Sequence, residues 1–194
     1  MKKELLTPRD DIFVVHDFLT PEECDKLIDH VEAFGFGEAT VNTSTGPLVN
    51  KGMRNNDRVI MDDGSLAREF WWKVREFIPD KRGMTPYGVN ERFRFYRYEP
   101  GQYFDWHFDA PYQRSGDDDT SVLTFMVYLS DCKGGTTDFH MGGDGQVKDD
   151  DPCIVKVQPT QGLALIFTHN VLHRGSEVVS GTKYVARSDI MYRR

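Results

Sequence analysis

The sequence predicts an α+β domain whose core is an antiparallel β-sandwich or an open barrel, and three observations support this prediction. Apolar residues repeat at helical spacing in two stretches of the first half of the chain. From Asn90 onward the repeat shortens to every second residue, which is typical of half-buried strands. Gly and Pro separate these alternating segments. Two helices that lead into five or more short strands favour this architecture.

The first predicted helix spans Pro21 to about Phe34. Thr20 precedes it as an N-cap residue and Glu23 follows the cap by three positions, so the two form a capping box with Pro21 in the first turn. Apolar residues then recur at i, i+3, i+4 and i+7, namely Cys24, Leu27, Ile28 and Val31. Gly35 is expected to end the helix.

A second helix is predicted between the start signal Asp62–Ser65 and Pro79, which cannot continue a helix. One apolar stripe connects these ends, made of Leu66, Phe70, Val74, Phe77 and Ile78. We expect Trp71 and Trp72 to pack between this helix and the sheet. The polar stretch Ala39–Val59 is expected to form a loop or weak strands.

Alternating apolar residues predict the strands of the second half. They mark Arg92–Tyr98, Thr120–Leu129, Ile154–Val157, Leu163–Phe167 and Lys183–Met191, and a short apolar run, Ile12–Val15, precedes the first helix. The length of 194 residues suits one domain. We therefore expect a single domain over 1–194, with helical support at about 12–80 and the strand core at about 88–194.

The composition excludes several function classes. The chain has 24 Lys and Arg against 31 Asp and Glu, so its net charge is −7, and we expect no nucleic-acid or anionic-lipid partner. No apolar run approaches the roughly 18 to 20 residues that span a bilayer, and no apolar segment follows Lys2 and Lys3. The 3 widely spaced cysteines suggest no disulfide framework, which fits a reducing cytoplasm. The oligomeric state stays open.

His107 and Asp109 form the first candidate metal-binding pair. On an extended segment, residues i and i+2 share a face, so both side chains can address one point while Phe108 turns away. A His-x-Asp pair also occurs on protein surfaces by chance. The pair alone therefore does not identify a metal site.

A third ligand is available from His169 or His173, which follow the predicted strand Leu163–Phe167. Two imidazoles and one carboxylate make a facial triad, which leaves about half of an octahedral Fe(II) open for other ligands. A closed structural zinc site would need four protein ligands instead.

Two further residues suit a buried dicarboxylate beside such a metal. Lys183 stands ten residues after His173, and Tyr98 stands nine residues before His107. A cation and a phenol aimed at one cavity would offset the high cost of removing a carboxylate from water. The cosubstrate 2-oxoglutarate carries a carboxylate of this kind.

Several segments follow one another in the order of a known family. They are Tyr98–Asp109, Tyr128–Asp131, Gly134–Phe139, Pro159–Phe167, and His173 with Lys183, and Phe18–Cys24 adds a strand-to-helix entry. With these segments the sequence resembles the Fe(II)/2-oxoglutarate-dependent dioxygenases of the prolyl 4-hydroxylase type. The resemblance extends from roughly Ile12 to Tyr192.

The resemblance implies a double-stranded β-helix, or jelly roll, with flanking N-terminal helices. It implies that His107, Asp109 and His173 hold the iron and are the catalytic residues. His169 lies four residues before His173 and is a rival on a straight strand. Only His173 is followed at ten residues by Lys183, so we prefer His173 as the ligand.

The resemblance also assigns the cosubstrate pocket. It implies that Lys183 pairs with the C5 carboxylate of 2-oxoglutarate and that Tyr98 and Tyr128 line the pocket. Arg187, four residues after Lys183, shares its face on a strand and is a rival for the carboxylate. We favour Lys183 over Arg187.

The activity implied by the resemblance is hydroxylation of a C–H bond. It would use Fe(II), 2-oxoglutarate and O₂, release succinate and CO₂, and take ascorbate as a candidate reductant. Asp109 favours hydroxylation, because halogenases of the wider superfamily carry a small residue there. The expected substrate is a prolyl residue in a peptide or protein, and a free amino acid or small metabolite is the alternative. A non-catalytic ligand-sensing module and a nucleic-acid demethylase are less favoured.

Two other features have two interpretations each. Arg94 shares the strand face of Tyr98, so it either binds an anionic group of the substrate or pairs with an acidic residue of the chain. The segment Met53–Arg58 either forms a lid over the site or is an ordinary polar loop.

Overall fold

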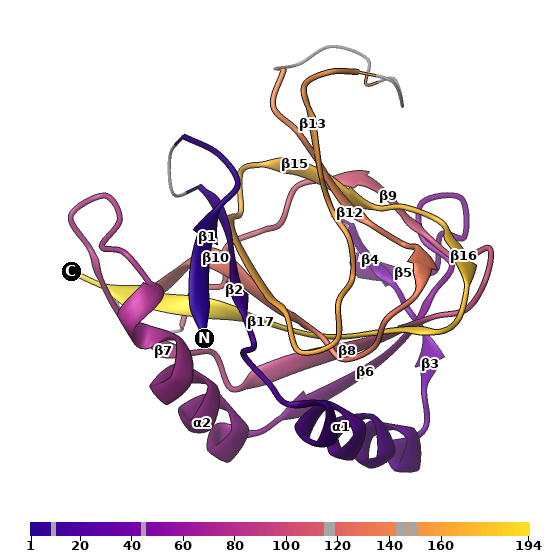
Figure 1. Ribbon diagram of the computed structural model, residues 1–194, viewed down its shortest axis with the longest axis horizontal. Helices are drawn as coiled ribbons and strands as arrows, with labels where there is room; N and C mark the ends of the chain where they lie inside the picture. The colour runs from indigo at the N-terminus through magenta and orange to yellow at the C-terminus, as the bar shows by residue number, and fades with distance from the viewer. Residues whose placement is uncertain (9–10, 44–45, 115–118, 143–146, 148–150) are drawn as a thin grey trace.

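The computed structural model describes residues 1–194 except 9–10, 44–45, 115–118, 143–146 and 148–150. Within this part of the chain the protein is built mainly from β-strands (Figure 1). Two facing sheets enclose the interior of a jelly roll, and both helices lie outside it. No helix of the described residues is long and apolar enough to cross a membrane.

The larger sheet has nine antiparallel strands. In spatial order they are β1 (Lys2–Leu5), β2 (Ile12–His16), β14 (Ala164–Thr168), β10 (Thr120–Tyr128), β17 (Lys183–Arg193), β8 (Arg92–Tyr98), β6 (Asp57–Asp62) and β3 (Gly37–Glu38), and β7 (Thr85–Val89) also pairs with β17. The long strand β17 lies between β10 and β8, so its inward side chains reach the centre of the molecule.

The smaller sheet has four strands and faces the larger one (Figure 1). Its order is β13 (Ile154–Val157), β12 (Thr137–His140), β15 (Leu172–Gly175) and β9 (Phe104–His107). Two minor pairs complete the described sheets, β11 (Lys133–Gly134) with β16 (Val178–Ser180) and β4 (Val41–Thr43) with β5 (Gly46–Leu48).

The two helices cover the outer face of the larger sheet, on the side away from the smaller sheet (Figure 1). They are α1 (Pro21–Phe34) and α2 (Gly64–Val74), and the short 3₁₀ helix Arg75–Phe77 follows α2. Phe70 of α2 is fully buried, with its ring centroid 5.7 Å from that of Phe93 and 5.9 Å from that of Phe125. These edge-on aromatic contacts fix the helix layer to strands β8 and β10.

Alternation along β8 divides the interior into two apolar clusters. Phe93 and Phe95 point toward the helices, whereas Tyr96 and Tyr98 point into the space between the sheets. Since successive strand residues face opposite sides, this one strand contributes to both layers. The inner cluster is where polar and charged side chains also collect.

The local sequence signals for α1 are confirmed. The backbone N–H of Thr20 donates to the Glu23 carboxylate at 2.8 Å, and the Glu23 N–H donates to the Thr20 hydroxyl at 3.2 Å. The second helix is shorter than predicted, because α2 ends at Val74 and the 3₁₀ turn continues only to Phe77. Trp72 was expected to pack inside, but it is 66% exposed and lies against the Arg75 guanidinium.

Candidate metal centre and the pocket beside it

Three side chains converge between the two sheets. His107 ends β9, and His173 of β15 is its direct partner in the sheet register, so the two imidazole rings lie 4.2 Å apart between centroids. Asp109 lies two residues beyond the end of β9, and its N–H donates to the carbonyl of His169 at 3.2 Å. Pairing of β9 with β15 therefore positions His107 beside His173, whereas a backbone hydrogen bond to His169 positions Asp109.

The distances suit a single metal ion. One ligand atom from each of His107, Asp109 and His173 lies within 4.8 Å of the others. The His107 Nε2 is 3.9 Å from one Asp109 oxygen, and the His173 Nε2 is 3.6 Å from the other. Within the described residues, these three form the one group with the spacing of a metal site.

Both histidines present an unprotonated nitrogen to the same point. The Nδ1 of His107 lies 2.7 Å from the carbonyl of Asp105, and the Nδ1 of His173 lies 2.9 Å from the carbonyl of Val171. Because a carbonyl oxygen only accepts hydrogen bonds, each Nδ1 carries the proton and each Nε2 keeps its lone pair. A fixed tautomer with Nε2 free is what a metal-binding histidine needs.

Burial keeps these groups in their metal-binding protonation states. Desolvation, reinforced by the nearby His173, lowers the pKa of His107 to about 3. Burial would raise the pKa of Asp109, but its neighbours together outweigh that effect, with Arg187 the largest contributor, and the net shift is downward. At neutral pH the centre therefore holds two neutral imidazoles and one carboxylate, a donor set that fits Fe(II).

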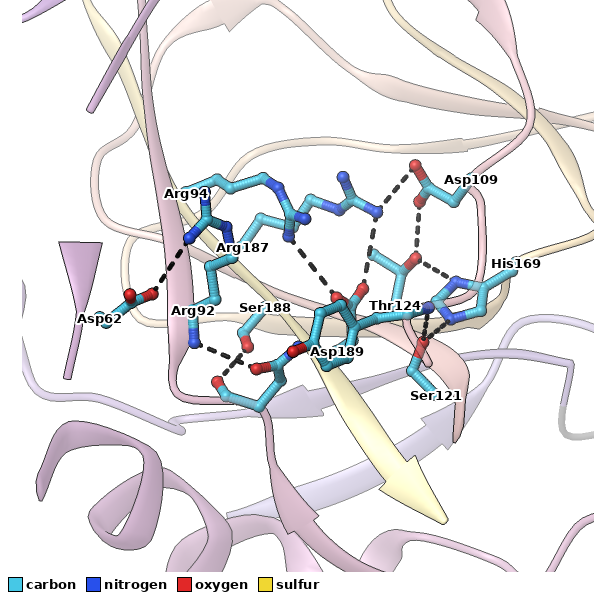
Figure 2. A network of polar contacts seen from close by, with 12 residues as sticks. Asp62, Arg92, Arg94, Asp109, Ser121, Thr124, His169, Arg187, Ser188 and Asp189 are labelled. Atoms are coloured by element: carbon cyan, nitrogen blue, oxygen red, sulfur yellow. Dashed lines mark hydrogen bonds and ion pairs between the residues drawn. The ribbon is translucent and has the colours of Figure 1, made fainter. Parts of the chain in front are cut away.

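Both oxygens of Asp109 are also held by neighbouring side chains (Figure 2). The Thr124 hydroxyl of β10 donates to Oδ2 at 2.6 Å, and the Arg187 guanidinium of β17 forms an ion pair with Oδ1 at 2.8 Å. Outer contacts of this kind orient a metal-binding carboxylate. Sequence reasoning missed Thr124, although a threonine at an inward position of an apolar strand is a detectable signal.

His169 is turned away from the metal point. Its Nδ1 lies 2.9 Å from the Thr124 hydroxyl and its Nε2 lies 2.8 Å from the Ser121 hydroxyl. Since Thr124 gives its proton to Asp109, the His169 Nδ1 must donate to Thr124. The two candidates that the sequence left open thus occupy different places. His173 lies beside Asp109, whereas the His169 side chain is connected to Asp109 through the Thr124 hydroxyl.

Lys183 lies in a pocket next to the metal point. It is 2% exposed, and its ammonium donates to the carbonyl of Gly135 at 2.6 Å. The rings of Tyr98 and Tyr128 flank it, with centroids 5.1 and 5.5 Å from Nζ. Gly135 has φ +63° and a side chain there would meet Cys132 and Val178, so glycine allows its carbonyl to reach the lysine.

The lysine has unused capacity for an anion. Its ammonium has three donors, and no carboxylate of the described residues pairs with it. Burial lowers the pKa of Lys183 to about 8. The same pocket is lined by Thr137, His107 and Asp109, so an anion bound to Lys183 would extend toward the metal point.

Arg187 lies in a different position from Lys183. Although the two share a strand face, the arginine pairs with Asp109 at 2.8 Å and lies 3.6 Å from Asp189. Burial disfavours the charge on Arg187, but Asp109 and Tyr96 outweigh it and raise its pKa. Between the two rival cations, the buried one without a carboxylate partner is Lys183.

The structure also places the two remaining sequence candidates. Arg94 lies on the inner face of β8, with Nη1 3.5 Å from an oxygen of Asp189. The segment around Arg54 is fixed against β9, because the Asp105 N–H donates to Met53 and the Asn55 N–H donates to Tyr103. Arg54 and Asn56 are buried, so this segment is a packed part of the wall.

Comparisons with known proteins agree with this architecture. The family model described as the 2OG-Fe(II) oxygenase superfamily matches residues 93–188. A probable prolyl 4-hydroxylase 6 of Arabidopsis thaliana is 31% identical, over 93% of this chain and 68% of its own length. Prolyl 4-hydroxylase 1 of the same plant is 29% identical, over 96% of this chain and 70% of its own length.

Solved structures show the same fold. A Pseudomonas putida prolyl-4-hydroxylase matches with a TM-score of 0.62 at 14% identity, covering 95% of this chain and 94% of its own. A Trichoplax adhaerens prolyl hydroxylase, in complex with a hypoxia inducible factor peptide fragment, matches with a TM-score of 0.67 at 15% identity and covers 93% and 83%. The chain therefore belongs to the 2OG-Fe(II) oxygenase superfamily as a prolyl 4-hydroxylase-like oxidoreductase, which uses Fe(II), 2-oxoglutarate and O₂.

Proposed function

We propose that this protein hydroxylates a prolyl residue in a peptide or protein. In this proposal His107, Asp109 and His173 are the iron ligands. The observation that carries it is the meeting of two unprotonated imidazole nitrogens and one carboxylate beside a buried lysine that lacks a carboxylate partner. The choice of a prolyl substrate is supported by relatives that are named prolyl 4-hydroxylases and by a structural neighbour that holds a peptide.

The iron and its cosubstrate would supply the oxidation, in which O₂ and 2-oxoglutarate give succinate, CO₂ and one oxygen atom inserted into a substrate C–H bond. The chain's own residues bind and orient. Lys183 pairs with the C5 carboxylate of 2-oxoglutarate, and Tyr98 and Tyr128 exclude water around that ion pair. Excluding water strengthens the attraction between the ammonium and the carboxylate.

The neighbours of Asp109 have a positioning role. Thr124 and Arg187 hold its two oxygens from β10 and β17, so the carboxylate cannot swing away from the two histidines. The backbone carbonyls of Asp105 and Val171 keep the imidazole rings in one orientation. The centre is thus organised before any ligand binds, which lowers the cost of binding.

The test is a product screen by mass. Purified protein with Fe(II), 2-oxoglutarate and O₂ is given proline-containing peptides in one set of reactions and free amino acids in another. The proposal predicts a gain of one oxygen atom on a prolyl peptide, with succinate formed in equal amount. A gain of oxygen only on a free amino acid would replace the proposal with the small-molecule alternative.

A further inference from the structure

Four arginines gather around Tyr96 on the inner wall next to the metal centre, and few acidic side chains accompany them. This arginine cluster consists of Arg54, Arg58, Arg94 and Arg187. Two of its members, Arg54 and Arg58, pair with no carboxylate of the described residues. The acids that do contact the cluster are Asp109 and Asp189.

Arg54 is the most deeply buried member, at 3% exposure. Its Nε and Nη2 both donate to the side-chain oxygen of Asn56, at 3.0 and 2.8 Å. Its guanidinium carbon lies 4.1 Å from the ring centroid of Phe104 and 5.0 Å from that of Tyr96. A neutral amide and two aromatic faces partly stabilise this cation but carry no negative charge that would neutralise it.

Arg94 and Arg187 stand opposite each other across β8 and β17 and share one acid, Asp189. The closest approaches to Asp189 are 3.5 Å for Arg94 and 3.6 Å for Arg187, both long for a charged hydrogen bond. Figure 2 shows the two side chains running alongside each other above Asp189. Within the described chain, the buried Nη1 of Arg94 and Nε of Arg187 have no hydrogen-bond partner.

The positive potential of the cluster affects the pKa of the Tyr96 phenol. Burial would raise the pKa of the Tyr96 phenol, but Arg187, Arg54 and Arg94 outweigh it, so the net shift is downward. The pKa of Arg58 is lowered by burial, and the other arginines add to that shift. One of the two nearby acids, Asp109, is also shared with the metal centre. The four arginines of the cluster therefore outnumber the two acids, Asp109 and Asp189, that contact them.

We propose that the arginine cluster binds a carboxylate of the substrate and so holds the substrate beside the metal centre. This inference rests on the proposed hydroxylase function and narrows its substrate class. The direct contact falls to Arg94, because its side chain is 21% exposed, whereas Arg54 is 3% exposed and packs on the rings of Tyr96 and Phe104. The Nη1 of Arg94 has no hydrogen-bond partner among the described residues, and a planar guanidinium matches the geometry of a carboxylate.

The position fits a hydroxylase. Arg187 joins the cluster to the metal centre through its 2.8 Å contact with Asp109, and Tyr96 and Arg187 both line the pocket that holds His107 and His173. A substrate anchored at Arg94 would thus present atoms near its carboxylate to the metal. The carboxylate can come from a free C-terminus or from an acidic side chain next to the reacting residue.

The probes are three short peptides that differ in one charge. Glycyl-prolyl-alanine has a free C-terminal carboxylate, its C-terminal amide lacks one, and the amide of glutamyl-prolyl-alanine carries the charge on a side chain. Calorimetric titration under argon into the Fe(II) and 2-oxoglutarate-loaded protein measures binding without turnover. A carboxylate probe is expected to bind at least about tenfold more tightly than the uncharged amide.

Variants then assign the effect to the cluster. Arg94→Gln and Arg54→Gln are each expected to remove the preference for the carboxylate, and Arg94→Lys to restore part of it. Arg92→Gln is the matched control, because Arg92 lies two residues away on the same strand with a 45% exposed side chain. Circular dichroism checks that each variant is folded, and Arg54→Gln serves if Arg94→Gln fails to fold.

The outcomes separate the two proposals. Equal affinity for charged and uncharged probes, no binding of any probe, or a preference that survives in folded Arg94→Gln protein would each overturn the carboxylate site. Preference for the free C-terminus or for the glutamyl peptide supports the site and identifies the source of the charge. Tight carboxylate binding without any oxygen gain on the peptides would contradict prolyl hydroxylation instead.

Discussion

The two faces of strand β8 show how one segment serves two purposes. Its outward residues, Phe93 and Phe95, are almost completely buried against the helix layer. Its inward residues include Arg94, Tyr96 and Tyr98, and the two tyrosines line the pocket that holds His107 and Asp109. The outer face lowers the free energy of folding through apolar burial, whereas the inner face carries charges whose burial is unfavourable.

Strand β17 repeats the contrast. Ala186 and Ile190 join the outer cluster, and Lys183 and Arg187 point inward. A buried ammonium without a carboxylate partner makes the folded state less stable than an apolar side chain of similar size would. The difference between the faces indicates that the inner face is maintained for binding. Substitutions on the inner face should therefore impair ligand binding or turnover with little loss of stability. Substitutions on the outer face should lower stability with little effect on ligand binding.

The largest effect is expected at the metal centre on the inner side. His107→Ala removes one of the three proposed ligands, so turnover of 2-oxoglutarate to succinate should fall below detection. The thermal unfolding midpoint should change little, because no stabilising charge pair is broken at a neutral imidazole. Succinate assays and thermal melts measure the two quantities. Full activity in His107→Ala would show that the metal lies elsewhere.

The outer face should give the reverse signature. Phe70→Ala leaves a cavity among Phe18, Phe93 and Phe125, so it is expected to lower the free energy of unfolding by about 3–5 kcal/mol. Denaturant titration measures this loss. In the protein that remains folded, the apparent constant for 2-oxoglutarate should match the wild type. If Phe70→Ala changed the apparent constant for 2-oxoglutarate and left the free energy of unfolding unchanged, the proposed separation of a stabilising outer face from a binding inner face would be wrong.

Lys183 should matter for binding and not for stability. Lys183→Met is expected to raise the apparent constant for 2-oxoglutarate by about 100-fold, because the C5 carboxylate would be buried without its partner. The unfolding midpoint should stay the same or rise, since burial lowers the lysine pKa and so penalises its charged form. Arg187→Met is the comparison, with a smaller effect on 2-oxoglutarate. The reverse ranking would transfer the anchor to Arg187.

The smallest expected effect is a pH dependence of cosubstrate binding. Burial lowers the pKa of Lys183 to about 8, so the ammonium is mostly charged below that pH and mostly neutral above it. Because the carboxylate binds the charged form, 2-oxoglutarate affinity should be constant below pH 8 and fall as pH rises beyond it, by up to about tenfold per unit.

Lys183→Arg is the control for this profile, because a guanidinium stays charged throughout the range. Its 2-oxoglutarate affinity should not fall above pH 8. Equilibrium titration of the loaded protein at a series of pH values measures both curves. A wild-type affinity that stays flat to pH 10 would assign the anchoring charge to another residue.

The sequence predicted those elements whose signals are local. The capping box at Thr20 and Glu23 marks α1, and alternating apolar residues mark β8 and β17. Strands β12 and β15 were not predicted. Each has four residues, and all four residues of β12 are buried although three are polar or charged, so no alternation marks it. Pairing within the smaller sheet creates these strands.

The candidate site divides in the same way. His107 and Asp109 could be selected from type and spacing, the family resemblance added His173 and Lys183, and the fold brings the four together. The contacts of Asp109 with Thr124 and Arg187 could not be predicted from the sequence, because the two residues belong to other strands, β10 and β17. Arg54 is a further example, since only packing against Phe104 and Tyr96 places it near the centre.

The most direct test of the central claim is a crystal structure of the protein grown under argon with Mn(II), in place of Fe(II), and 2-oxoglutarate. We predict one metal ion bound by His107, Asp109 and His173, with the C5 carboxylate of 2-oxoglutarate on the Lys183 ammonium between Tyr98 and Tyr128. A metal ion bound without these three side chains would contradict the proposed centre. A C5 carboxylate on Arg187 would contradict the proposed anchor.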